Sequence, residues 1–296
     1  MKINSFAKHE ERWQKMAKLW SLYSKYSRPS PEDIRHFNEY LQFALKGISE
    51  PLVVLLGATP EIRDLLLKYS KKQKAKIICV DMTKDMFMAM SHLTHHKNSR
   101  EQFVLSNWLS ISKKMKPKSV DVVIGDFVIG NVGEHEKKFL KEVSSILKSN
   151  GFFITRAYYH TDRVQKVPNF VKELRRLAQR VKRGKYTIKD AKEYFMNNTM
   201  YSTWYLRKDN KVSLSYRQKE YENIRNDTRF LGRTEGKIFK SFWKAWWPLR
   251  DKYWTDLPKN ELQSIIRRHF IIRKTLFSHD YERAEFCPIY LLRKKK

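Results

Sequence analysis

The stretch that decides the fold is Val53–Glu61, which reads VVLLGATPE. Its first four residues are an apolar run typical of a buried strand, and Gly57 and Pro60 mark a tight turn that opens a helix. A second apolar run, residues 75–80, follows and ends at Asp81. A strand, a turn, a helix and a second strand ending in a carboxylate are the parts that hold an adenosine-containing cofactor. We expect the turn to place such a cofactor against backbone N–H groups, and Asp81 to accept hydrogen bonds from its ribose diol.

Apolar strands and amphipathic helices alternate on both sides of this stretch. The pattern predicts strands at 52–56, 76–80, 102–105, 120–124 and 151–155, and helices at 31–46, 60–70, 84–93 and 134–148. Such alternation favours a mostly parallel sheet that is covered by helices on both faces. After residue 160 the pattern changes, and a helix at 258–268 with strands at 270–277 and 286–292 closes the chain.

Residues 1–48 are expected to form an N-terminal helical cap. Residues 10–26 place four large apolar side chains three and four positions apart on one helical face, namely Trp13, Met16, Trp20 and Tyr23. A second helix begins with Ser30 at the N-cap, Pro31 at the first helical position and Asp33 where a capping box places its acid.

The composition bounds the class of protein. The chain has 296 residues and 41% hydrophobic content, enough for a packed core. No apolar run approaches the roughly 18 residues that span a bilayer, and the N-terminus lacks the apolar core of a secretory signal. Cys79 and Cys287 lie in apolar strand-like runs, which predicts buried thiols in place of a disulfide or a metal site. We therefore expect a cytoplasmic protein.

The chain is strongly basic, with a formal net charge of +30. Residues 161–257 carry 24 Lys and Arg against 11 Asp and Glu, and they hold five of the eight tryptophans. Such charge favours polyanions, although Lys-rich solvated surfaces are the alternative reading. Residues 168–200 have a helical pattern. Four tryptophans at near-helical spacing are read mainly as core, and otherwise as a substrate-binding or base-stacking wall: Trp243, Trp246, Trp247 and Trp254.

This order of elements resembles the class I S-adenosylmethionine-dependent methyltransferases. The resemblance implies a Rossmann-like seven-stranded, mostly parallel sheet with an antiparallel last strand. It assigns the cofactor-binding core to 49–160 and a mainly helical insertion after strand five to 161–257, which in this family commonly covers the substrate. Residues 258–296 then supply the C-terminal helix and β-hairpin that complete the sheet.

The resemblance also implies site residues, motif by motif. Leu55–Glu61 occupies the place of the glycine-rich first motif, and Asp81 that of the ribose-binding acid. Asn107 and Trp108 follow strand three, where the family often has an acid and an aromatic beside the adenine. The cofactor-binding residues implied in this way are Arg28, Gly57, Ala58, Thr59, Pro60, Asp81, Met82, Asn107, Trp108, Asp126 and Phe127.

Asp126 is the candidate catalytic residue, because it matches the fourth motif at the mouth of the methyl-transfer site. This carboxylate is also a candidate helix N-cap, and the two roles are compatible. Tyr158 and His160, which follow strand five, are weaker candidates for a group near the methyl. Tyr26 and Arg28 precede the first motif and are expected to close over the cofactor. The alternative for Arg28 is a surface residue beside a turn.

Two departures from the family pattern stand out. The first motif has a single glycine, so Ala58 and Thr59 must be accommodated beside the cofactor, with Pro60 preorganising the helix. Pro288 lies in an expected strand, where a missing N–H marks either the start of the strand or a bulge. More narrowly, the motifs RPSPED (28–33) and LGATPE (56–61) resemble a bacterial subfamily of these enzymes that has no established substrate.

The substrate stays open between a small molecule held under the insertion and RNA or another polyanion bound by its basic, aromatic surface. A catalytically inactive nucleic-acid-binding module is a different class that shares the fold. A nicotinamide-dependent Rossmann enzyme is disfavoured by the C-terminal hairpin and the single glycine. The histidines show no metal-ligand spacing, so no metal is expected, and no Gly-x-Ser-x-Gly elbow supports a serine hydrolase.

Overall fold

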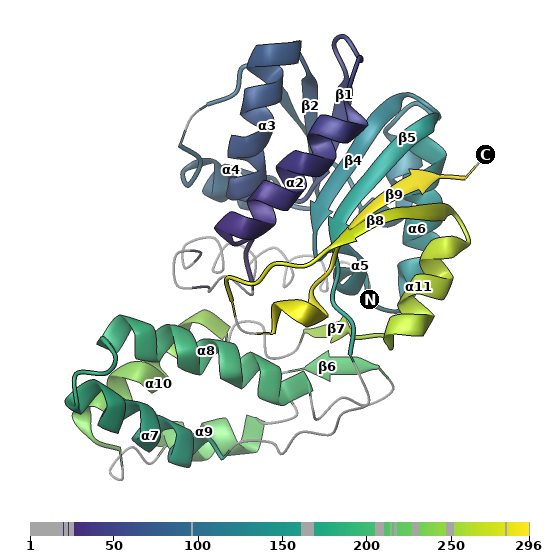
Figure 1. Cartoon of the computed structure of the whole chain (residues 1–296). Coiled ribbons are helices and arrows are strands. Elements are labelled where there is room, and N and C mark those ends of the chain that lie inside the picture. The colour runs from purple at the N-terminus through teal and green to yellow at the C-terminus, as the bar shows by residue number, and fades with distance from the viewer. Residues whose placement is uncertain are drawn as a thin grey trace.

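The computed structural model places a seven-stranded sheet, covered by helices, above a separate lobe of helices (Figure 1). The residues that it describes are 20, 23, 27–95, 97–160, 169–204, 210–213, 215, 218–226, 231–246, 252–281 and 283–295. Most of the helix expected at 10–26 lies outside these residues, as do Tyr26 and Trp247.

The sheet has the strand order β3-β2-β1-β4-β5-β9-β8. Its strands are β1 (Leu52–Leu56), β2 (Lys76–Asp81), β3 (Glu101–Leu105), β4 (Val120–Asp126), β5 (Leu147–Arg156), β8 (Phe270–Leu276) and β9 (Ile289–Lys294). The first five strands are parallel, whereas β9 is antiparallel to both of its neighbours. The predicted fold class is therefore confirmed. Pro288 directly precedes β9, so its missing N–H falls at the start of the strand.

Helices cover both faces of the sheet because the central strands are apolar on both sides. In β1, Val53 and Leu55 pack into one core with α2 (Pro31–Ala44) and α3 (Pro60–Gln73). Val54 and Leu56 point the other way, into a core with α6 (Glu136–Ile146) and α11 (Lys259–Arg267). Shorter elements complete this layer, namely α4 (Lys84–Ser91), α5 (Val128–Asn131), η2 (Trp108–Lys113), η3 (Gly133–His135) and η6 (Ala284–Phe286).

The start of α2 follows the sequence prediction. The Ser30 hydroxyl accepts a hydrogen bond from the Asp33 N–H, and the Asp33 carboxylate accepts one from the Ser30 N–H. This is the predicted capping box, with Pro31 in the first turn. Both cysteines are free and buried, as expected. Among the described residues, no helix is long and apolar enough to cross a membrane.

The insertion between β5 and α11 is mainly helical, as predicted. It contains α7 (Phe170–Lys182), α8 (Ile188–Trp204), α9 (Gln218–Asn226) and α10 (Arg233–Trp246), and a small antiparallel pair, β6 (Lys211–Ser213) with β7 (Tyr253–Thr255). The helical pattern at 168–200 corresponds to two helices, α7 and α8, because the chain turns between them at Gly184, which has φ +68°. Buried aromatic rings, such as Phe170 stacked on Tyr221 at 4.9 Å, form the core of the lobe, which is continuous with Ala58, Met86 and Met90 of the sheet domain.

Candidate active site

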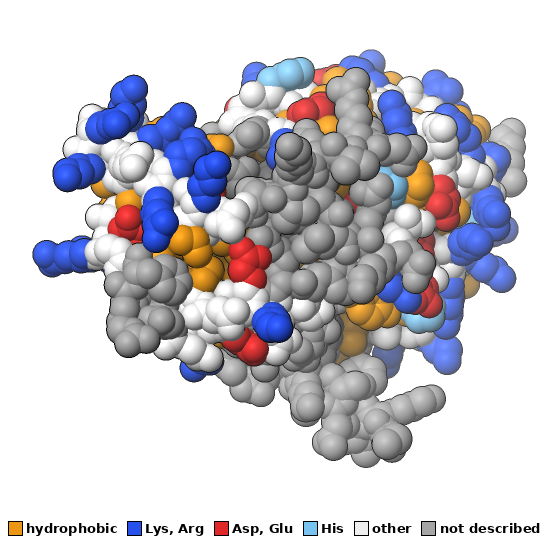
Figure 2. Space-filling model, turned by 90° about the horizontal axis from the view of Figure 1, so that it is seen from below, with side chains coloured by type: hydrophobic (Ala, Val, Ile, Leu, Met, Phe, Trp, Pro, Cys, Tyr) orange, Lys and Arg blue, Asp and Glu red, His pale blue; other side chains and the backbone are white. Residues whose placement is uncertain are grey.

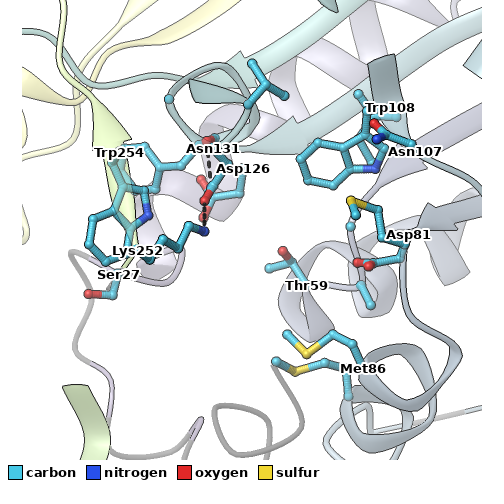
Figure 3. A pocket seen from close by; sticks show the side chains of 18 of the residues that line it. Ser27, Thr59, Asp81, Met86, Asn107, Trp108, Asp126, Asn131, Lys252 and Trp254 are labelled. Atoms are coloured by element: carbon cyan, nitrogen blue, oxygen red, sulfur yellow. Dashed lines mark hydrogen bonds between the residues drawn. The ribbon is translucent and has the colours of Figure 1, made fainter. Parts of the chain in front are cut away.

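A cavity of about 330 Å³ opens at the carboxyl ends of β1, β2 and β4 and is bounded on one side by the insertion. This edge, where the strand order reverses, is where open α/β sheets bind ligands. All of the predicted cofactor residues except Arg28 and Pro60 line the cavity. Figure 3 shows Asp81, Asn107 and Trp108 on one side of it, and Asp126, Asn131, Lys252 and Trp254 on the other.

The turn after β1 explains how one glycine suffices in the first motif. Gly57 has φ +88°, a conformation that favours glycine, and its N–H donates to the Val80 carbonyl at 2.9 Å. Ala58 and Thr59 have no positive φ, so their side chains cost no backbone strain there. Pro60 starts α3 without reaching the cavity. The tight turn therefore needs glycine at a single position.

Asp81 lies at the end of β2 and faces the cavity. The Thr83 N–H donates to its carboxylate at 3.2 Å, which fixes the side chain from behind. Burial raises the pKa of Asp81 to about 6, and the backbone N–H groups of Thr83 and Met82 and the charge of Lys252 oppose this rise. At neutral pH the group is thus an ionised double acceptor.

Asn107 and Trp108 follow β3 and form the far wall. The Asn107 side-chain oxygen accepts from the Leu109 N–H at 2.8 Å, so this residue starts the 3₁₀ turn η2 as its N-cap. The Trp108 indole N–H donates to the Val80 carbonyl at 2.8 Å. The ring is thereby fixed against the Gly57 turn, where a Cβ added to the glycine would lie 3.7 Å from it. This geometry gives the cavity a rigid aromatic surface.

Asp126 is held by a buried arginine. Arg156, at the end of β5, donates from Nε and Nη2 to the two Asp126 oxygens at 2.7 and 2.9 Å. Its Nη1 donates to the Asp33 carboxylate at 2.5 Å and to the Tyr281 hydroxyl at 3.1 Å. The Arg156 side chain is fully buried, and its guanidinium lies 4.1 Å from the centre of the Phe127 ring. Four segments of the chain therefore meet at one guanidinium.

The helix N-cap considered for Asp126 is wrong. Helix α5 is capped by Phe127, which has φ +53°, whereas Asp126 is the last residue of β4. Burial raises the pKa of Asp126 to about 6, against the lowering effect of Arg156. Its carboxylate is thus ionised at neutral pH and paired on both oxygens.

The remaining candidates divide between the cavity and its surroundings. The Arg28 guanidinium donates to the Glu61 carboxylate at 2.7 Å and does not line the cavity. Tyr158 does line it, whereas His160 lies outside and contacts Asn210 at 3.4 Å. Among the described residues no group of acids, histidines or cysteines could hold a metal ion.

Sequence reasoning considered Trp254 for a substrate-binding wall in the insertion, and Trp254 does line the cavity, but it missed Lys252 beside it. Lys252 Nζ donates to the Asn131 side-chain oxygen at 2.6 Å and lies 5.2 Å from the Trp254 ring centre. Trp254 is on β7, so its assignment to a helical stripe is wrong. Trp243, by contrast, lies on α10 and packs on Phe239. The alternation of polar and aromatic residues at Lys252, Tyr253 and Trp254 is typical of a strand, but no local sequence pattern predicts that this strand lies beside α5.

Comparison with known families decides the class of protein. A sequence model of the family described as a methyltransferase domain matches residues 63–227, more than half of the chain. The chain belongs to this family. It is an S-adenosylmethionine-dependent methyltransferase domain, as the order of its elements predicts. Comparison with curated proteins finds no match.

Solved structures agree with this methyltransferase in fold alone. A structure titled as putative Zn-dependent alcohol dehydrogenases from Rhodobacter sphaeroides aligns over 97% of this chain and 99% of its own, with 12% identity and a TM-score of 0.57. The CurJ carbon methyltransferase aligns over 92% of this chain and 57% of its own, with 8% identity and a TM-score of 0.50.

Proposed function

We propose that this methyltransferase transfers the methyl group of S-adenosylmethionine to a small molecule enclosed between the strand ends and the insertion. The observation that supports it most strongly is the cavity, which brings residues from β1, β2, β4 and the insertion around one space of about 330 Å³. That volume lies at the lower end of the range for small-molecule pockets.

The residues present fit the cofactor. Asp81 offers two acceptor oxygens to a ribose diol, and Trp108 offers a fixed aromatic face to the adenine. Gly57 keeps the turn free of side-chain atoms, and Ala58 and Thr59 line the cavity behind it. Bound there, the cofactor supplies a methyl group on a sulfonium. The subfamily with the RPSPED and LGATPE motifs is the narrower assignment that we propose.

Catalysis in this proposal rests on positioning and on exclusion of water. Asp126 acts as a positioning residue, because taking up a proton would cost its bidentate pair with the buried Arg156. Arg156 also packs on Phe127, so one guanidinium fixes both residues at the mouth of the methyl-transfer site. Tyr158 brings a hydroxyl-bearing side chain to the same cavity.

RNA or another polyanion is the second candidate acceptor, and the net charge of +30 favours it. Figure 2 shows Lys and Arg side chains on the helical lobe and also at the opposite edge of the same face. Such a spread favours solubility and general attraction more than one defined groove. A salt titration of RNA binding separates an RNA acceptor from a small-molecule acceptor. A shallow dependence of the RNA affinity on salt would mean few phosphate contacts and would argue against RNA.

Binding of the cofactor is the direct test. Mass spectrometry of the purified protein under non-denaturing conditions is expected to show bound S-adenosylhomocysteine, and calorimetry one site per chain for the added compound. If neither method detects S-adenosylhomocysteine on the protein, the proposal is overturned and the inactive nucleic-acid-binding alternative is favoured.

A further inference from the structure

The insertion places one ammonium group at the cavity wall. Lys252 is only 9% exposed, although it belongs to a residue type that is mostly exposed. The Asn131 side-chain oxygen accepts from its Nζ at 2.6 Å, and the Asn131 amide donates to the Phe127 carbonyl at 2.9 Å. Trp254 lies beneath the ammonium at 5.2 Å. The position of the charge is therefore fixed by α5 and β7 together.

Lys252 lies on the acceptor side of the cavity. The residues assigned to the cofactor lie at the carboxyl ends of β3, β2, β1 and β4, and Asp126 ends β4, the last strand of this row. Lys252 is tied to Asn131 on α5, which begins after β4 and lies beyond this row. Figure 3 accordingly shows Lys252 across the cavity from Asp81 and Trp108. A cofactor that runs along the strand ends leaves this corner to the second substrate.

The surroundings of Lys252 define what the corner accepts. Trp254, Val132 and Tyr158 contribute mostly apolar surface there. The charge of Lys252 acts on the Asp81 carboxylate across the cavity, whereas Asp126 is paired with Arg156. Among the described residues that line the cavity, Lys252 is the one cationic side chain, and none is an arginine. A single ammonium suits a carboxylate, whereas a phosphate is usually held by several donors or by an arginine fork.

We propose that the methyl acceptor is a small carboxylic acid with an apolar or aromatic body, whose carboxylate is bound by Lys252. The inference rests on the proposed function and deepens it. A charge-assisted hydrogen bond from a buried ammonium is stronger than one in water and fixes the acid at one end. The apolar body then extends along Trp254 and Val132 toward the mouth of the methyl-transfer site. A carboxylate belonging to the cofactor is the other anion that Lys252 has within reach, and the experiment separates the two.

Calorimetry on the full chain saturated with S-adenosylhomocysteine tests the proposal. The probes are benzoate, 2-aminobenzoate, 4-hydroxybenzoate and indole-3-acetate, each compared with its neutral amide. At least one acid is expected to bind at least tenfold more tightly than its amide. In Lys252→Met this preference is expected to disappear, while the affinity for S-adenosylhomocysteine stays within about twofold, as for a side chain outside the cofactor site. Lys252→Arg keeps the charge and is expected to retain most of the preference.

The control is Lys259→Met, an exposed lysine over Tyr159 outside the cavity, which is expected to leave every value unchanged. Three results would overturn the proposal: no acid binds the saturated wild type, the preference survives in Lys252→Met, or that variant loses at least tenfold in S-adenosylhomocysteine affinity while Lys252→Arg does not. The last result would assign Lys252 to the cofactor. Failure of the proposed function has a different signature, because the wild type would then not bind S-adenosylhomocysteine at all.

Discussion

The two walls of the cavity are built in different ways. The wall with Gly57, Asp81 and Trp108 comes from strand ends, and each residue lies within three positions of a short apolar run. The wall with Lys252 and Trp254 comes from the insertion, and these two residues lie more than 90 positions after the end of β5. The first wall has a form that the fold requires, whereas the second depends on how a separate helical lobe packs. The difference indicates that the fold fixes the wall proposed for the cofactor, whereas the wall proposed for the acceptor depends on the insertion.

Removal of Arg156 is expected to have the largest effect, because the strand-end wall depends on it. Arg156→Met leaves two buried carboxylates, Asp33 and Asp126, without their cationic partner. We expect the free energy of unfolding to fall by about 3–5 kcal/mol, the cost of breaking a buried ion pair. Urea denaturation measures it. Arg35→Met, on the exposed Arg35–Glu32 pair, is the matched control and should change it by less than about 1 kcal/mol. Equal effects in both variants would contradict a structural role for the buried guanidinium.

Asp81→Ala tests the cofactor side alone. Loss of two hydrogen bonds to a charged acceptor is expected to weaken S-adenosylhomocysteine binding about 100-fold, at roughly 1.5 kcal/mol for each bond. Calorimetry gives the affinity. Glu39→Ala removes an exposed carboxylate that is paired with Lys274 far from the cavity, and its affinity should equal that of the wild type. Unchanged affinity for S-adenosylhomocysteine in Asp81→Ala would contradict the assignment of Asp81 to the ribose.

Gly57→Ala tests whether a single glycine is indeed required at the turn. With φ +88° and the added Cβ at ordinary contact distance from Trp108, the cost is backbone strain of about 1–2 kcal/mol. Thermal and urea unfolding measure the loss. The control is Gly236→Ala in α10, where a Cβ meets nothing within 4 Å. That change should stabilise the protein slightly, by up to about 1 kcal/mol. Opposite signs for the two variants are the expected result.

The pH dependence of binding is the subtlest probe of Asp81. With its pKa raised to about 6, this carboxylate is ionised above pH 6 and becomes protonated below it. Affinity for S-adenosylhomocysteine should therefore be level near pH 7.5 and fall as the pH drops through 6, by about tenfold at pH 5 if only the ionised form accepts. Asp81→Asn should show weak, nearly flat binding over the same range. A wild-type profile that is flat to pH 5 would argue against this titration.

Sequence alone predicts the sheet and the strand-end residues because both depend on short-range patterns. Apolar runs fix β1 and β2, and Asp81 follows from its place after a strand. The capping box of Ser30 and Asp33 is local as well. Arg156 and Lys252 escaped prediction because their partners lie far along the chain, at Asp33 and Asn131. Such contacts appear only when the topology brings the segments together.

A crystal structure of the protein with S-adenosylhomocysteine tests the central claim most directly. The adenine is expected against Trp108, the ribose diol on the Asp81 carboxylate, and the sulfur at the Asp126–Phe127 end of the cavity, with Lys252 free of the cofactor. A ribose bound away from Asp81, or a cofactor carboxylate on Lys252, would contradict the division between a cofactor wall and an acceptor wall.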